Sequence, residues 1–226
     1  MQPDKGEIIM KVYIYKVDKM YIGEKMTAIR EMLCDWRREK IDKLKVEDSV
    51  LTSAGAGLLV QRALKKSFGI KKDDINIVYN EMGKPYLKDF PDYFFNLAHS
   101  GNYCVVVTDD SECGVDIETK DDKNLAVTRR LFTDNERSII ENAPPKERQI
   151  EFRKIWTMKE AYLKLNGTGI SIPLKSFEVT PDRCTVKNGD ENIYLINEVS
   201  HKEEYIIAIA SKKDKFSLDI EYIESI

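Results

Sequence analysis

The order of hydrophobic periodicities constrains this fold most, because strand and helix patterns each occur in two separate blocks along the 226 residues. Alternation of β-branched and apolar residues predicts strands at 8–17, 75–79, 94–97, 103–108, 114–118, 177–180, 192–199, 205–210 and 217–222. Apolar residues at helical spacing predict helices at 24–45, 50–68, 125–132 and 146–165. We therefore predict an α+β protein.

Local signals sharpen several of these boundaries. Gly69 and Gly167 follow the second and last predicted helices, where a left-handed terminating residue belongs. Thr133 with Glu136 three positions later forms a capping-box pattern. The segment 98–101 is expected to interrupt the strand that begins at Phe94, and the strands at 103–108 and 114–118 are expected to pair as a hairpin.

The patterns divide into two α+β halves with a seam near 108–113, and no linker rich in proline, glycine or serine separates them. We predict an N-terminal half at 1–110 and a C-terminal half at 111–226.

Composition excludes several classes of protein. The net charge of −3 argues against a general affinity for nucleic acid. No apolar run reaches the roughly 18 residues of a membrane span, and residues 1–7 lack the apolar core of a signal peptide. Four cysteines without a CxxC pair, together with two histidines, disfavour a zinc site or a disulfide framework. We expect a cytoplasmic protein with reduced thiols.

A basic cluster lies inside the first predicted helix. It consists of Arg37, Arg38, Lys40, Lys43 and Lys45. Such a run is commonly a solvated helix face, and the alternative is a local site for an anion. The sequence pattern leaves both open.

The segment Gly114-Val-Asp-Ile-Glu118 is a candidate metal site. Alternate residues of a strand point to one face, so Asp116 and Glu118 are expected side by side while Val115 and Ile117 enter the core. Two adjacent carboxylates suit a hard cation such as Mg²⁺. The alternative is the polar face of an edge strand.

Three further segments carry chemistry. Glu160 and Lys164 are one helical turn apart and point to the same side, as in a common surface ion pair. The pair His99-Ser100 can donate hydrogen bonds to a phosphate or serve a structural role. The segment Gly83-Lys84-Pro85 is by itself a turn signal.

Taken in order, these segments resemble one family. They are Gly83-Lys84-Pro85, Phe95-Asn-Leu-Ala-His-Ser100, Gly114-Val-Asp-Ile-Glu118 and Trp156-Thr-Met-Lys-Glu-Ala-Tyr-Leu-Lys164, followed by Gly167 and Gly169. This set resembles the Sfp-type 4′-phosphopantetheinyl transferases over essentially the whole chain. The resemblance implies a monomeric pseudo-dimer of two similar halves with coenzyme A between them. It also implies Mg²⁺-dependent transfer of the phosphopantetheine arm to a serine of an apo acyl or peptidyl carrier protein, releasing adenosine 3′,5′-bisphosphate.

The resemblance also assigns roles to individual residues. Asp116, Glu118 and Glu160 match the metal-binding carboxylates, and Glu160 also matches the residue usually proposed as the base for the serine. Lys164 matches a phosphate-neutralising lysine. Residues expected to contact coenzyme A are His99 and Ser100 at its phosphates, Lys84 and Pro85 beside the nucleotide, and Arg37 and Lys40 at the 3′-phosphate.

Two positions depart from the family pattern, and both concern the nucleotide. Ala98 stands where many relatives have serine, and Leu51 stands where many have arginine. Competing hypotheses are a different Mg²⁺-dependent phosphotransferase, for which no Walker A or kinase glycine loop is present, and a degenerate non-catalytic module that binds coenzyme A or a carrier protein.

Overall fold

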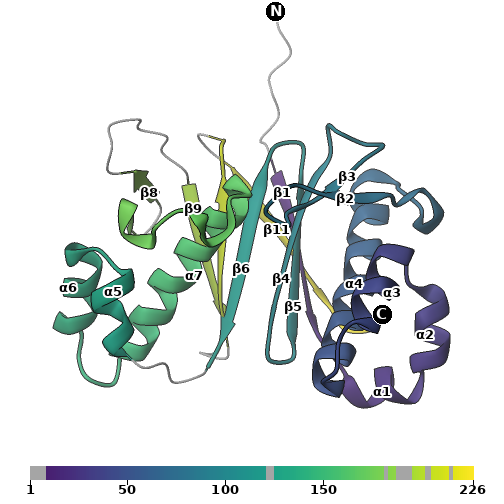
Figure 1. The fold of residues 1–226 in the computed structure, drawn as a ribbon, viewed down its shortest axis with the longest axis horizontal. Coiled ribbons are helices and arrows are strands. Elements are labelled where there is room, and N and C mark those ends of the chain that lie inside the picture. The colour runs from purple at the N-terminus through teal and green to yellow at the C-terminus, as the bar shows by residue number, and fades with distance from the viewer. Residues whose placement is uncertain (1–8, 121–124, 181–182, 187–194, 202–204, 214–215) are drawn as a thin grey trace, which may run out of the picture.

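The computed structural model describes residues 9–120, 125–180, 183–186, 195–201, 205–213 and 216–226. Two sheets stand at the centre, with α4 (Glu47–Phe68) covering the outer face of one and α7 (Arg148–Asn166) covering the outer face of the other (Figure 1). The chain is thus built in layers of helix, sheet, sheet and helix, and the predicted α+β class is confirmed.

The first sheet has the order β11-β1-β5-β4, and the second has the order β6-β10-β9. Their strands are β1 (Ile9–Lys16), β4 (Phe94–Ser100), β5 (Tyr103–Asp109), β6 (Cys113–Thr119), β9 (Leu195–His201), β10 (Tyr205–Ser211) and β11 (Ser217–Ile223). All neighbours are antiparallel except β1 and β11, so the C-terminal strand joins the sheet of the N-terminal half. Two small ladders pair β2 (Ile77–Tyr79) with β3 (Pro85–Leu87), and β7 (Phe177–Thr180) with β8 (Arg183–Val186).

Shorter helices flank the two long ones. On the N-terminal side these are α1 (Lys19–Glu24), α2 (Met26–Met32), α3 (Asp35–Asp42) and η1 (Lys72–Asp74). On the C-terminal side they are η2 (Leu125–Val127), α5 (Thr128–Leu131), α6 (Asp134–Asn142), η3 (Gly169–Ser171) and η4 (Leu174–Ser176). None of the described helices combines the length and the apolar character needed to cross a bilayer.

Strand alternation divides the core into three parts. Val12 and Ile14 of β1 pack between the two sheets, against residues such as Val115 and Ile117 of β6. The intervening residue Tyr13 points the other way and joins the core beneath α4. A third cluster lies between α7 and the second sheet. Each sheet is therefore buried on both faces, which explains the dense apolar runs in its strands.

Three sequence predictions about this architecture were wrong. The helical stretch 24–45 is interrupted, because Leu33 and Cys34 are extended and the Cys34 amide donates to Gln61 Oε1 at 2.6 Å. The predicted hairpin is also absent, since β5 and β6 belong to different sheets.

The strand β4 continues to Ser100, where an interruption was predicted at 98–101. His99 pairs with Cys104, and the turn comes at Gly101, whose φ is +55°. Cross-strand pairing outweighed the local turn signal. By contrast, the left-handed residues Gly69 and Gly167 and the capping box of Thr133 and Glu136 are confirmed.

The two halves meet where β4 lies beside β6, and side chains of β4 supply the bonds there. Asn96 Oδ1 accepts from the Val115 amide at 3.0 Å, and Ser100 Oγ accepts from the Thr119 amide at 3.1 Å. These contacts fix β6, which carries the Gly114–Glu118 segment, against the N-terminal half.

Candidate functional site

A cavity of about 430 Å³ lies between the two halves. Its walls come from α3, the β2–β3 turn and β4 on one side and from α7 on the other. Most of the predicted site residues line it: Arg37, Lys40, Lys84, Pro85, His99, Glu160 and Lys164. Lys40 and Lys164 are 124 positions apart in the sequence and line the same cavity. The charge of Lys164 lowers the pKa of both Lys40 and His99.

Arg37 is the most unusual residue of the N-terminal wall, because its guanidinium is buried with an exposed fraction of 1%. It stacks on Trp36 at 4.1 Å, and Nη1 donates to Ser53 Oγ at 3.2 Å. Its Nε and Nη2 have no hydrogen-bond partner among the described residues. Burial lowers the pKa of Arg37 to about 10. A buried cation with unused donors, in a residue that lines a cavity, is suited to an anionic ligand.

Lys40 adds a second cation to this wall, and His99 lies under the influence of both. Burial lowers the pKa of Lys40, and Arg37 and Lys164 lower it further. Burial also lowers the pKa of His99, with Lys40, Arg37 and Lys164 adding to the shift. An anion in the cavity would relieve the repulsion among these groups.

The predicted carboxylates lie on the C-terminal side, and of these Glu160 lines the cavity. Lys164 Nζ donates to Asp116 Oδ1 at 2.6 Å, which connects β6 with α7. Burial raises the pKa of Asp116, against the influence of Lys164. Burial also raises the pKa of Glu160, and the charges of Asp116 and Glu118 contribute to that shift. The charges of Asp116 and Glu118 therefore reach Glu160 on the neighbouring helix.

Gly114 explains how α7 comes so close to the carboxylates. A Cβ at this position would lie 2.2 Å from the Ala161 carbonyl oxygen and 2.4 Å from the Leu165 amide nitrogen. Only glycine leaves room for this contact of strand and helix backbone. The glycine therefore brings the face of β6 that carries Asp116 and Glu118 next to the turns of α7 that carry Glu160 and Lys164.

Within the described ranges, no three Asp, Glu, His or Cys side chains are gathered closely enough to hold a metal ion. Asp116 Oδ2 is buried and has no hydrogen-bond partner in the described part of the chain. The available donors are all carboxylate oxygens, which suit Mg²⁺. A buried acceptor without a donor is suited to a cation.

Three of the predicted residues do not line this cavity, and a fourth uses its charged group elsewhere. Asp116, Glu118 and Ser100 are not among its lining residues. The Ser100 hydroxyl hydrogen-bonds Thr119 Oγ1 at 3.0 Å at the junction of the halves. The Lys84 ammonium donates to the Leu165 carbonyl at 2.7 Å, so only the rest of this side chain is available to the cavity.

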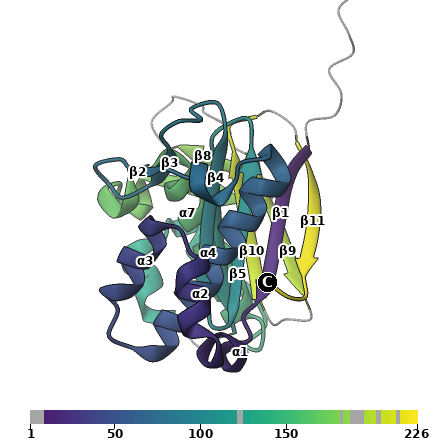
Figure 2. The same ribbon diagram turned by 90° about the vertical axis from the view of Figure 1, so that its right-hand side faces the viewer.

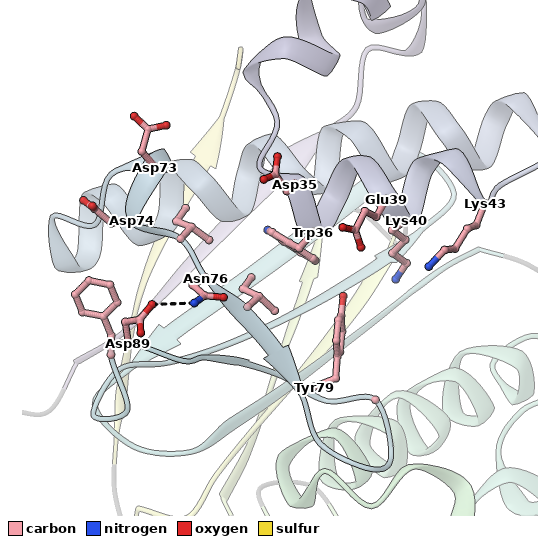
Figure 3. A pocket seen from close by; sticks show the side chains of 14 residues that line it. Asp35, Trp36, Glu39, Lys40, Lys43, Asp73, Asp74, Asn76, Tyr79 and Asp89 are labelled. Atoms are coloured by element: carbon pink, nitrogen blue, oxygen red, sulfur yellow. Dashed lines mark hydrogen bonds between the residues drawn. The ribbon is translucent and has the colours of Figure 1, made fainter.

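Sequence reasoning did not single out Trp36, Tyr79 and Asn96, which also line the cavity. Asn96 lies within the segment Phe95–Ser100 that was recognised, and its buried side chain supports β6. Trp36 and Tyr79 carried no signal beyond helix and strand spacing. A second, larger cavity of about 1070 Å³ adjoins this one along α3 and β2, sharing Trp36, Lys40, Tyr79 and Gly83 (Figure 3).

Two sequence families match this chain in tandem. Residues 22–111 match "4'-phosphopantetheinyl transferase, N-terminal", and residues 112–210 match the "4'-phosphopantetheinyl transferase superfamily". The 4'-phosphopantetheinyl transferase ffp of Bacillus subtilis is 30% identical over 170 residues, covering 75% of this chain and 76% of the relative. A second 4'-phosphopantetheinyl transferase of Bacillus subtilis is 28% identical over 218 residues, covering 94% of this chain and 96% of the relative.

The chain belongs to the Sfp-type 4′-phosphopantetheinyl transferases. It is an enzyme that transfers a phosphopantetheinyl group to carrier proteins, and coenzyme A is the substrate of this family. Two tandem family matches over two α+β halves also confirm the predicted pseudo-dimeric fold of this transferase.

Proposed function

We propose that this transferase is Mg²⁺-dependent and releases adenosine 3′,5′-bisphosphate as it modifies a serine of an apo acyl or peptidyl carrier protein. The observation that carries the proposal is one cavity with Arg37 and Lys40 in its N-terminal wall and with Glu160, under the influence of the Asp116 and Glu118 charges, in its C-terminal wall. The cationic wall suits the phosphates of coenzyme A. The carboxylates suit a metal and a proton acceptor.

The N-terminal wall binds the nucleotide end of coenzyme A in this proposal. Arg37 and Lys40 receive the 3′-phosphate, which supplies the buried guanidinium with acceptors. His99 and Ser100 lie toward the pyrophosphate, and Lys84 and Pro85 form the wall beside the nucleotide. Lys164 offsets the negative charge of the pyrophosphate from the opposite side.

Asp116, Glu118 and Glu160 would hold the Mg²⁺ ion. Bound there, it would neutralise pyrophosphate charge that otherwise repels an incoming nucleophile. The Lys164 ammonium, which donates to Asp116 Oδ1, offsets the charge of this carboxylate and in this proposal turns to a phosphate when coenzyme A binds.

Glu160 accepts the proton of the carrier serine, directly or through one water. A serine hydroxyl is a weak nucleophile until a base takes its proton, and burial beside Asp116 raises the pKa of Glu160 and thus its affinity for a proton. The serine oxygen forms a bond to the phosphorus that bears the pantetheine arm. The bond from this phosphorus to the bridging oxygen breaks, and adenosine 3′,5′-bisphosphate leaves.

The carrier protein docks near α5 in this proposal. Arg129 and Arg130 are exposed there, the Arg129 carbonyl accepts from Lys175, and Leu131 is partly exposed. A basic surface with apolar neighbours suits the acidic surface of a carrier protein. The alternative of a non-catalytic binding module is less well supported, because Glu160 and the other carboxylates are all present.

We also infer a cytoplasmic monomer without nucleic-acid or membrane partners, divided into halves at 1–110 and 111–226. The division is supported by the passage of the chain from one central sheet to the other between Asp109 and Cys113. The return of β11 to the first sheet ties the halves into one body.

The test is incubation with coenzyme A, Mg²⁺ and apo carrier proteins from fatty-acid, polyketide and nonribosomal peptide synthesis. We expect a mass gain of one phosphopantetheine on at least one carrier, equimolar release of adenosine 3′,5′-bisphosphate, and loss of both upon chelation of the metal. Turnover that persists after chelation would refute the metal dependence. Absence of product with every carrier would refute the function.

A further inference from the structure

The turn between β2 and β3 makes side-chain contacts with the C-terminal end of α7, although the two belong to different halves. Asn80 Oδ1 accepts from the Met82 amide at 3.0 Å and from the Lys84 amide at 2.8 Å. Asn80 Nδ2 donates to the Gly167 carbonyl at 2.8 Å. These bonds fix the orientation of the amide, because the opposite orientation would set its NH₂ group against two donors. Figure 2 shows the hairpin close to α7.

Lys84 makes the second contact. Its ammonium donates to the Leu165 carbonyl at 2.7 Å, and the residue is buried with an exposed fraction of 7%. The last carbonyls of a helix lack helical partners and carry its negative dipole end, so a buried cation is well placed there. The Lys84 ammonium is thus used within the protein.

Gly167 allows this contact. Its φ is +62°, and a Cβ there would lie 2.9 Å from Asn80 Nδ2 and 2.9 Å from Lys84 Cδ. At the end of the helix, the Gly167 amide donates to the Lys164 carbonyl at 3.3 Å, and the Thr168 amide donates to the Leu163 carbonyl at 3.4 Å. The other half of the molecule therefore supplies the donors for the Leu165 and Gly167 carbonyls.

We propose that Asn80 and Lys84 are positioning residues that clamp the end of α7, and with it Glu160 and Lys164, at a fixed distance from Arg37 and Lys40. The inference rests on the proposed function, in which coenzyme A reaches both walls of the cavity. In this inference the Gly83-Lys84-Pro85 segment helps to hold the two walls of the cavity at a fixed distance. The Lys84 ammonium makes no ionic contact with the nucleotide.

Asn80→Asp tests the clamp, because a carboxylate keeps the two acceptor bonds of the turn and loses only the donor to Gly167. We expect kcat to fall on the order of tenfold, since small displacements of reacting groups have large effects on rate. The dissociation constant of adenosine 3′,5′-bisphosphate, measured by calorimetry, should stay within about twofold, because the N-terminal wall is untouched. Hydrogen exchange of the Gly167 and Thr168 amides should accelerate.

Lys84→Met is the second variant, and it keeps the aliphatic stem while removing the ammonium. If the two residues act as one clamp, the double variant should lose little more kcat than the more affected single variant. Asn76→Ala is the matched control, because Asn76 precedes the same hairpin and bonds only Asp89 among the described side chains, at 3.0 Å. It should leave kcat and exchange at the α7 end unchanged.

Wild-type kcat and exchange in both variants would overturn the clamp. So would weaker binding of adenosine 3′,5′-bisphosphate with unchanged exchange, which would place the turn in direct contact with the nucleotide. Exchange at Gly167 and Thr168 is measured without turnover. It therefore tests the clamp even if no carrier protein is modified, and the two failures remain distinct.

Discussion

The two long helices occupy corresponding places in the two halves, but they approach their neighbours through different close contacts. In α4 the glycine is on the helix: a Cβ at Gly57 would meet the Arg37 and Leu33 side chains at 2.4 and 2.8 Å. In the α7 layer the glycine is on the strand, and Gly114 faces helix backbone at 2.2 Å. Side chains can adjust and backbone cannot, so the contact at Gly114 is the more rigid of the two. We propose that the N-terminal wall binds the nucleotide and that the C-terminal wall carries out the chemistry.

The largest expected effect tests this division directly. Glu160→Gln should lower kcat on the order of a thousandfold, within the range for loss of a general base. Coenzyme A should still bind, because Arg37 and Lys40 remain. Single-turnover kinetics and calorimetry separate the two quantities. Glu151→Gln, which removes a partly exposed ion pair with Lys154 on the same helix, should leave both near wild type.

Gly114→Ala should have the next largest effect, because the new methyl group forces β6 away from the α7 backbone. We expect a loss of kcat on the order of a hundredfold and a loss of unfolding free energy of about 1–3 kcal/mol. The comparison is Gly57→Ala, whose methyl meets side chains, Arg37 and Leu33, and should mainly raise the KM for coenzyme A. Equal effects of the two substitutions on kcat would contradict the proposed difference between the walls.

Arg37→Met should affect binding and stability in opposite directions. Hydrogen bonds to charged groups contribute about 1.5–3 kcal/mol, so the KM for coenzyme A should rise on the order of tenfold to a hundredfold with kcat nearly unchanged. The unliganded protein should gain about 1 kcal/mol, because a buried cation with unused donors is removed. Urea unfolding of the unliganded protein measures this gain. A loss of stability would show that the contacts of the guanidinium with Ser53 and Trp36 outweigh the cost of burying its charge.

The smallest expected effect concerns pH. Burial and three nearby cations lower the pKa of His99 from its ordinary value of 6.5. The unfolded chain therefore binds the proton more tightly, and the contribution of neutral His99 to stability is complete above about pH 6.5 and declines as the pH falls from there toward the folded pKa. His99→Gln should flatten the dependence of unfolding free energy on pH in this window. An unchanged slope would mean that another group titrates there.

Local patterns in the sequence predicted much of the fold and the carboxylate face. Helix α4, its terminating Gly69, the capping box at Thr133 and most strands depend on short-range preferences, and these were predicted correctly. The strand period alone put Asp116 and Glu118 on one face and Val115 and Ile117 in the core, as the structure has them. Local rules suffice when each side chain's partner lies a few residues away.

Tertiary structure decided the rest. The break in the first helical stretch depends on Gln61, which is 27 residues from Cys34, and the separation of β5 from β6 depends on which sheets they join. The sequence pattern left open whether Arg37 belongs to a solvated helix face or to an anion site, and packing against Trp36 and Gly57 buries it at the cavity. Lys84 and Leu165 are 81 residues apart and bond directly. Sequence determined which groups are present, while packing determined their solvation and their partners, because burial and charge interactions depend on distance in space.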